Sequence, residues 1–164
     1  MTCTIDQWAG AATAATIDIA IQVLGLDAAI QLEQAVPFAA PFAAYVPLSS
    51  SDSHIQLGIV AELIDCERIS RTLLCLSDEE PFASEGDVAD AIGELANVIA
   101  GATKTMMNPT VPDIVLGLPL CVKGRIETQG VEQAATELLV GSMRVRIVLL
   151  RSPAGPKSRP RTAG

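Results

Sequence analysis

The chain has 164 residues, of which 49% are hydrophobic and only 3% aromatic, and its formal charge at pH 7 is −8. This length is typical of one domain with its own core. The few aromatic residues indicate an interior of Ala, Val, Ile and Leu, which favours helices packed closely on a sheet. The acidic charge, with no Lys or Arg before Arg68, argues against nucleic acid or an anionic membrane as the main partner. A partner with a basic patch would suit it better.

The first part of the chain predicts a helix followed by short strands. The helix is expected over Asp6–Leu24, with Gly25 placed where a C-terminal cap belongs. Apolar runs bounded by Pro or Ser clusters then predict three strands. These strands are expected over Ile30–Val36, Phe42–Leu48 and His54–Leu63.

The second part predicts two helices, three more strands and a tail. A short amphipathic helix is expected over Glu67–Leu76 and a longer one over Asp87–Met107. The later strands are expected over Asp113–Val122, Thr136–Ser142 and Arg144–Leu150. Residues 1–151 are interpreted as a single domain. Residues 152–164, which are basic and rich in Pro, predict a disordered tail.

Four scattered cysteines and a single histidine bear on metal binding and on the cellular compartment. The cysteines form no C-x-x-C motif, and His54 is the only histidine, so no zinc site is predicted. The first 20 residues lack a basic segment and do not predict a secretory signal, which favours reduced thiols and a cytoplasmic protein. Three prolines interrupt the longest uncharged run, Gln34–Ser51, so it does not predict a membrane helix.

The predicted helix over Asp87–Met107 has two different faces. At about 100° per residue, its large apolar residues form one narrow stripe that predicts the core. The stripe consists of Val88, Ile92, Leu95, Ile99, Ala102 and Met106. The opposite face carries Asp90, Glu94, Asn97 and Lys104, interleaved with Gly93 and Gly101.

The two glycines lie one turn before and one turn after Asn97. Each interior glycine costs a helix about 1 kcal/mol, so both suggest the close approach of another molecule beside Asn97. A plainer interpretation is also open, because Glu-x-x-Asn is common on solvated helices, and Asp90 and Lys104 could simply complement the helix dipole.

Residues Asp87–Lys104 resemble the signature helix of the CheC, CheX and FliY phosphatases of bacterial chemotaxis, in which Glu-x-x-Asn is followed by Gly and then Lys. Residues Asp113–Gly124, with their Pro and closing Gly, are similar to the next strand of the CheX branch. The opening helix, Trp8–Leu26, holds no second Glu-x-x-Asn, which makes the chain more similar to CheX than to CheC. The resemblance implies an α+β, CheC-like fold: a largely antiparallel six-stranded sheet packed against about three helices, in a homodimer.

The resemblance also implies an activity, namely hydrolysis of the aspartyl phosphate of CheY or a similar response regulator. Asn97 would orient the attacking water without adding a repelling negative charge, and Glu94 would anchor the receiver domain. The remaining members of the face would contact the partner, namely Asp90, Gly93, Gly101 and Lys104. The chain is expected to hold no cofactor of its own, the Mg²⁺ belonging to the receiver. Two alternatives remain: a non-catalytic module that binds a receiver or a motor-switch protein through the same face, and a structural dimerisation domain.

Overall fold

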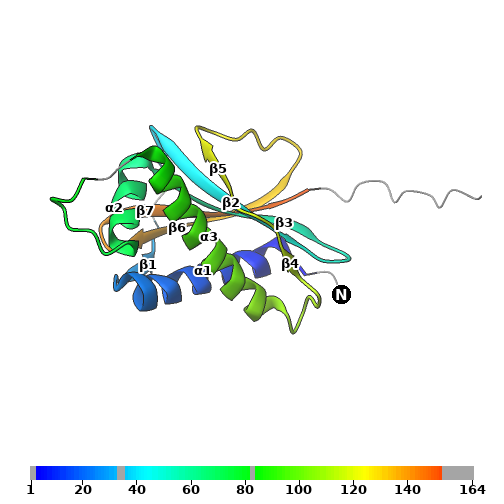
Figure 1. Cartoon of the computed structure of the whole chain (residues 1–164). Coiled ribbons are helices and arrows are strands. Elements are labelled where there is room, and N and C mark those ends of the chain that lie inside the picture. Colours follow the sequence, from blue (N-terminus) through cyan, green and yellow to red (C-terminus); the bar gives the residue numbers. More distant parts are fainter. Residues whose placement is uncertain (1–2, 33–35, 82–83, 153–164) are drawn as a thin grey trace, which may run out of the picture.

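The computed structural model describes residues 3–32, 36–81 and 84–152. In this part of the chain it contains three α-helices, a short π-helix and seven strands, which confirms the predicted α+β class (Figure 1). The helices are α1 (Ile5–Ile19), continued by the π-helix η1 (Ala20–Leu24), α2 (Leu63–Leu73) and α3 (Glu85–Met107). Of the predicted tail, only Ser152 is among the described residues.

The seven strands form one antiparallel sheet. They are β1 (Ala28–Ile30), β2 (Pro41–Ser49), β3 (His54–Glu62), β4 (Val115–Leu116), β5 (Leu120–Lys123), β6 (Glu132–Val140) and β7 (Met143–Arg151). Their order is β1-β6-β7-β3-β2-β4, and β5 also pairs with β2. Because β4 and β5 share the edge beside β2, the sheet has six strand positions, which is the number that the sequence predicts.

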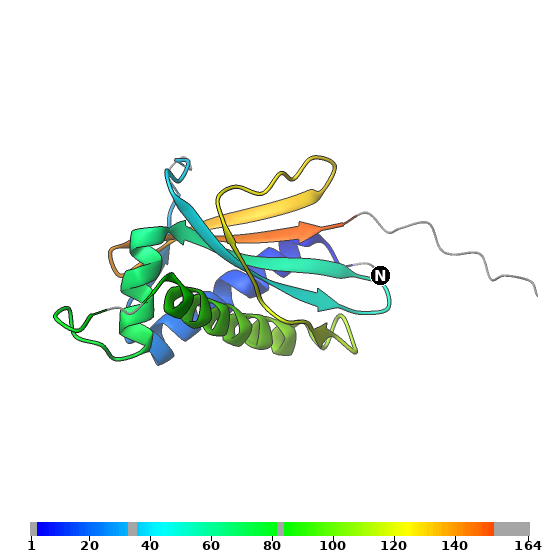
Figure 2. The same ribbon diagram turned by 45° about the horizontal axis from the view of Figure 1, so that its top comes forward.

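All three helices lie on one side of the sheet, and Figure 2 shows α1 and α3 running beneath it with α2 across one end. The main core lies between these layers and includes Trp8 from α1 and Ile92 from α3, which are 1% and 0% exposed. Strand β2 is buried on both faces, because alternate residues also contribute to a second, smaller cluster on the helix-free face. The second cluster contains Phe38, Ala43, Tyr45, Val60 and Leu150.

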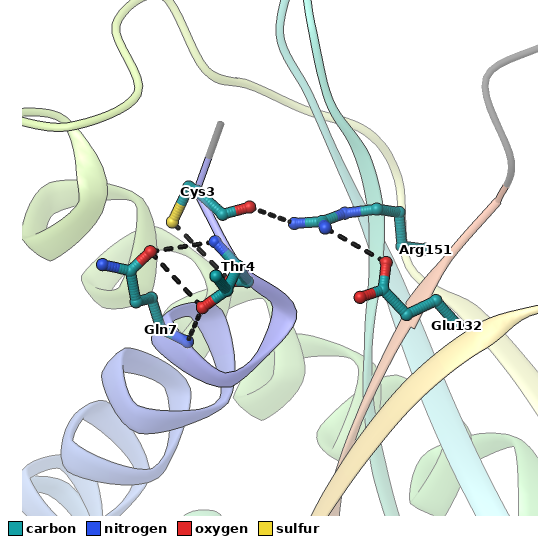
Figure 3. A network of polar contacts seen from close by, with 5 residues as sticks. All are labelled: Cys3, Thr4, Gln7, Glu132 and Arg151. Atoms are coloured by element: carbon teal, nitrogen blue, oxygen red, sulfur yellow. Dashed lines mark hydrogen bonds and ion pairs between the residues drawn. The ribbon is translucent and has the colours of Figure 1, made fainter. Parts of the chain in front are cut away.

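Polar contacts fix the start of α1 to the end of the sheet (Figure 3). The Thr4 hydroxyl accepts a hydrogen bond from the Gln7 backbone N–H at 3.3 Å, and the Gln7 side chain accepts one from the Thr4 backbone N–H at 2.9 Å. This reciprocal pair is a capping box. The guanidinium of Arg151, the last residue of β7, donates to the Cys3 carbonyl at 2.7 Å and pairs with Glu132 of β6 at 3.1 Å. The opening helix is therefore held at its first turn.

Most predicted elements are confirmed, and the differences lie at edges and ends. Gly25 adopts the left-handed conformation, with φ 65°, that its predicted capping role requires. The strand predicted over Ile30–Val36 is wrong over most of its length, because only Ala28–Ile30 pairs with β6 and Leu32 is 94% exposed. Its residues 33–35 lie outside the described part of the chain. The strand predicted over Asp113–Val122 is interrupted between β4 and β5.

The second predicted helix also begins earlier than expected. Helix α2 starts at Leu63, immediately after β3, and ends at Leu73 rather than Leu76. Its buried residues include Cys66 and Ile69, which face the main core. The earlier start uses the last predicted residue of the preceding strand as the first residue of the helix.

Residues 36–40 lie on the helix-free face and are fixed there by charged side chains of the sheet. The Phe38 ring is 3% exposed and lies under the guanidinium groups of Arg144 and Arg146, at 4.2 and 4.8 Å. The Glu62 carboxylate accepts hydrogen bonds from the backbone N–H groups of Ala40 and Ala39, which lower the pKa of Glu62. A cavity of about 680 Å³ opens beside this segment, lined in part by Phe38, Arg146 and Tyr45 of β2.

Candidate functional site

Helix α3 begins at a defined cap and buries one face in the core. The Ser84 hydroxyl accepts a hydrogen bond from the Asp87 backbone N–H at 3.3 Å, and Glu85 pairs with Lys123 at the end of β5. Four members of the predicted apolar stripe are buried: Val88, Ile92, Leu95 and Ile99. The stripe fails in the last turn, where Met106 is 45% exposed and Met107 is buried in its place.

The difference is confined to the last turn of the helix. Val88 and Met106 are 18 residues apart, or five turns of about 3.6 residues, so the helical repeat alone predicts the same side for both. The buried residues of the last turn are instead Thr103 and Met107. Both side chains face the core, and the hydroxyl of Thr103 bonds to the Ile99 carbonyl at 2.8 Å.

The opposite face of α3 presents the predicted pair. Glu94 is exposed and Asn97 is half-buried, one turn apart on the same side of the helix. Among the residues that the structure describes, neither the Glu94 carboxylate nor the Asn97 carboxamide has a hydrogen-bond or ion-pair partner. Asp90 is exposed and Lys104 is half-buried on this face. The donors and acceptors of the pair are therefore available to another molecule.

The two glycines of this helix face differ in their surroundings. At Gly101 an added Cβ would meet nothing within 4 Å, so the backbone there is open to close approach, as predicted. Gly93 is buried, and an added Cβ would lie 3.6 Å from Pro119 and 3.7 Å from the Cys121 sulfur. The prediction that Gly93 lies on the open face is wrong, because the segment that joins β4 to β5 covers it.

That covering segment is the part of the site that the sequence pattern did not identify. The Cys121 thiol donates a hydrogen bond to the Ala89 carbonyl at 3.3 Å, which joins β5 to α3. Burial, followed by the negative charge of Asp90, raises the pKa of Cys121, so this thiol stays neutral. Two features of the sequence could have indicated this contact: a helix glycine with no evident role, Gly93, and a proline, Pro119, in the next predicted strand.

No group of three or more His, Cys, Asp or Glu in the described ranges could hold a metal ion. The four cysteines, Cys3, Cys66, Cys75 and Cys121, are free thiols. No helix within the described ranges is long and apolar enough to cross a membrane.

A neutral carboxamide beside a carboxylate can orient a water molecule and bind a cation. Asn97 carries both hydrogen-bond donors and an acceptor, whereas Glu94 at neutral pH carries only acceptors. Such a pair completes a site only when a second molecule supplies the reacting group.

Comparison with known proteins identifies the fold. The sequence matches no protein-family model and no curated protein. The chemotaxis protein CheX from Vibrio vulnificus superposes with a TM-score of 0.71 and 15% identity, over 92% of this chain and 100% of that chain. CheX from Desulfovibrio desulfuricans gives a TM-score of 0.72 and 12% identity, over 88% of this chain and 99% of that chain.

A third solved structure contains a partner protein. It is the complex of CheX, CheY, BeF3 and Mg²⁺ from Borrelia burgdorferi, which matches with a TM-score of 0.69 and 16% identity, over 93% of this chain and 100% of that chain. These likenesses confirm the predicted CheC-like fold and the resemblance to CheX proteins over about nine-tenths of the chain.

Proposed function

We propose that the chain is a CheX-like member of the CheC/CheX/FliY family and accelerates hydrolysis of the aspartyl phosphate of CheY or a similar response regulator. One observation supports the proposal most directly: Glu94 and Asn97 lie on the open face of α3 with their polar groups unpaired among the described residues. The CheX of Borrelia burgdorferi, which shares the fold, is solved in a complex with CheY. The proposed partner is therefore a receiver domain.

In the proposed reaction, a water oxygen bonds to phosphorus as the bond from phosphorus to the aspartyl oxygen breaks. The products are the aspartate carboxylate and inorganic phosphate, which retains the protons of the water. The Asn97 amide oxygen accepts a hydrogen bond from the water and its N–H donates to a phosphoryl oxygen, so the water is held in line. Because the carboxamide is neutral, it does not repel the phosphoryl group. The Mg²⁺ required for this chemistry belongs to the receiver.

Docking of the receiver uses the rest of the open face. The Glu94 carboxylate pairs with a lysine of the receiver and so fixes where the receiver docks along α3. Gly101 leaves room for close approach on the C-terminal side of Asn97. Asp90 and Lys104 extend the contact along the helix. The chain's formal charge of −8 favours encounter with a basic surface.

The proposal includes a cytoplasmic location and a homodimer, both by analogy with CheX. Strand β1 lies at one edge of the sheet, and β4 and β5 lie at the other. An exposed edge can pair with a second copy of the same chain.

The decisive test is the decay of phosphate on CheY-type receivers encoded in the same genome, each phosphorylated with acetyl phosphate. The chain should accelerate the decay, and Asn97→Ala should reduce the acceleration at least about 100-fold, as the loss of an oriented donor does. Asn97→Asp should lose as much, because its charge repels the phosphoryl group. Gln56→Ala is the matched control and should keep full activity, because Gln56 is an exposed carboxamide on the helix-free face of β3.

Two results would contradict the proposal. Full activity of Asn97→Ala would remove the assigned role of this residue. Binding of a phosphorylated receiver with no acceleration of decay by the unaltered chain would favour the non-catalytic module.

A further inference from the structure

The edge of the sheet next to α3 contains a β-bulge. Leu116 of β4 pairs with Leu48, and Leu120 of β5 pairs with Tyr45, in the same partner strand β2. Three residues of the edge strand, 117–119, therefore lie opposite two residues of β2, 46–47. One extra residue of this kind interrupts the alternation of side chains and turns one of them in a new direction.

The bulge is clamped on both sides by close contacts. The Gly117 backbone N–H donates to the Pro47 carbonyl at 2.8 Å, and an added Cβ at Gly117 would lie only 2.3 Å from Pro47 Cγ. On the other side, Pro119 packs onto Gly93 of α3. Leu118 lies between these two contacts, and its side chain is 87% exposed. A single exposed leucine is ordinary, but this one is held on a fixed backbone.

The bulge lies level with the candidate pair on α3. Pro119 contacts Gly93, and Cys121 contacts Ala89, so the edge strand runs antiparallel to the helix. From Pro119 to Cys121 the strand rises about 6.6 Å, and from Gly93 to Ala89 the helix rises about 6 Å. The strand and the helix therefore stay side by side between the two contacts. Continuing in the other direction, residue 117 reaches the level of Asn97. Leu118 is then level with the turn from Glu94 to Asn97.

We propose that Leu118 is the apolar anchor by which the phosphorylated receiver domain binds beside Glu94 and Asn97. This inference rests on the proposed function and names a specificity contact for the same site. A receiver that docks on Glu94 and brings its phosphoryl group to Asn97 also covers the bulge level with this turn of the helix, where Leu118 lies. Contact with Leu118 removes its side chain from water, while Glu94 supplies the charged contact. The bulge presents the leucine before binding, so little conformational freedom is lost.

The experiment separates affinity from turnover. Phosphate decay is measured over a range of receiver concentrations, and binding is measured with the same receiver loaded with beryllofluoride. Leu118→Ala should raise KM and Kd about tenfold with unchanged kcat, and Leu118→Asp should raise both further. Leu32→Asp is the matched control, because Leu32 is 94% exposed beyond β1, at the opposite edge of the sheet. Asn97→Ala should instead lower kcat and leave Kd nearly unchanged.

Each contrary outcome has a distinct meaning. Unchanged KM and Kd in Leu118→Asp would overturn the anchor and leave the proposed function standing if Asn97→Ala is inactive. Equal losses of receiver affinity in Leu118→Asp and Leu32→Asp would also overturn the anchor. So would a Leu118→Asp variant that changed its oligomeric state while its receiver affinity stayed the same. Full activity of Asn97→Ala would overturn the proposed function itself. Unchanged thermal unfolding of each variant establishes that the comparison concerns folded protein.

Discussion

Helices α1 and α3 cover the same face of the sheet side by side, yet their outer surfaces differ. Both bury an apolar face in the main core, and both carry a glycine at which an added Cβ would meet nothing, Gly10 in α1 and Gly101 in α3. Only α3 adds an unpaired carboxylate and carboxamide, Glu94 and Asn97, one turn apart. Helix α1 is therefore an internal control for α3, because it has the same inward packing and an open glycine but lacks the unpaired carboxylate and carboxamide.

The comparison also separates two uses of glycine. Gly101 leaves a space that the described residues do not fill, whereas Gly93 leaves a space that Pro119 of the same chain fills. A glycine on a polar helix face therefore does not by itself indicate an external partner, because at Gly93 the approaching group belongs to the same chain. The residues that approach Gly93 are those that place the bulge beside the candidate pair.

The inner faces of the two helices should be equally sensitive to truncation. Trp8 of α1 is 1% exposed and Ile92 of α3 is 0% exposed. Trp8→Ala should lower the free energy of unfolding by about 3–5 kcal/mol and Ile92→Ala by about 2–5 kcal/mol, through lost burial and the cavity left behind. Urea denaturation measures both. If one variant lost less than 1 kcal/mol, that helix would not be part of the common core.

The sequence predicts the helices and central strands well because their signals are local. The apolar positions of α3 from Val88 to Ile99 repeat at helical spacing, and β7 alternates Val145 and Ile147 with Arg144 and Arg146. Each pattern needs only neighbours along the chain. The pair Glu94 and Asn97 was likewise visible as one face of a helix, and the structure leaves that face open.

The missed features depend on residues far apart in the chain. Residues 36–40 are fixed by Arg144 and Arg146, more than 100 positions away, and no local pattern indicates this contact. The bulge needs the register of β4 and β5 against β2, which a one-residue slip would change. The strand predicted over Ile30–Val36 was wrong for the same reason. The extent of β1 depends on its partner β6, which lies more than 100 residues later in the chain.

Filling the two open glycines should distinguish the outer faces. Gly101→Leu and Gly10→Leu should each raise the free energy of unfolding by about 0.5–1 kcal/mol, because leucine is the better helix former and an added Cβ meets nothing at either position. Only Gly101→Leu should impair phosphate decay, by about tenfold in kcat/KM, because the new side chain obstructs the docked receiver. Equal activity of the two variants would mean that the receiver does not approach Gly101.

The smallest expected effects on activity come from the helix caps. Thr4→Ala and Ser84→Ala each remove one hydroxyl that accepts a backbone N–H at the first turn, of α1 and α3 respectively. Each should lower the free energy of unfolding by about 1 kcal/mol, whereas Ser84→Gly should cost only about a few tenths, since glycine is tolerated at this position.

None of the three cap variants should alter phosphate decay. Glu94 lies ten residues beyond Ser84, or about 15 Å along α3, and fraying is confined to the first turn. The turn that carries Glu94 and Asn97 is held from behind by Ile92 and Leu95 in the core and from the side by Pro119. A loss of turnover in Ser84→Ala at a temperature where the protein is folded would show that the pair depends on the helix end. In that case the contacts at Gly93 would not be sufficient to hold it.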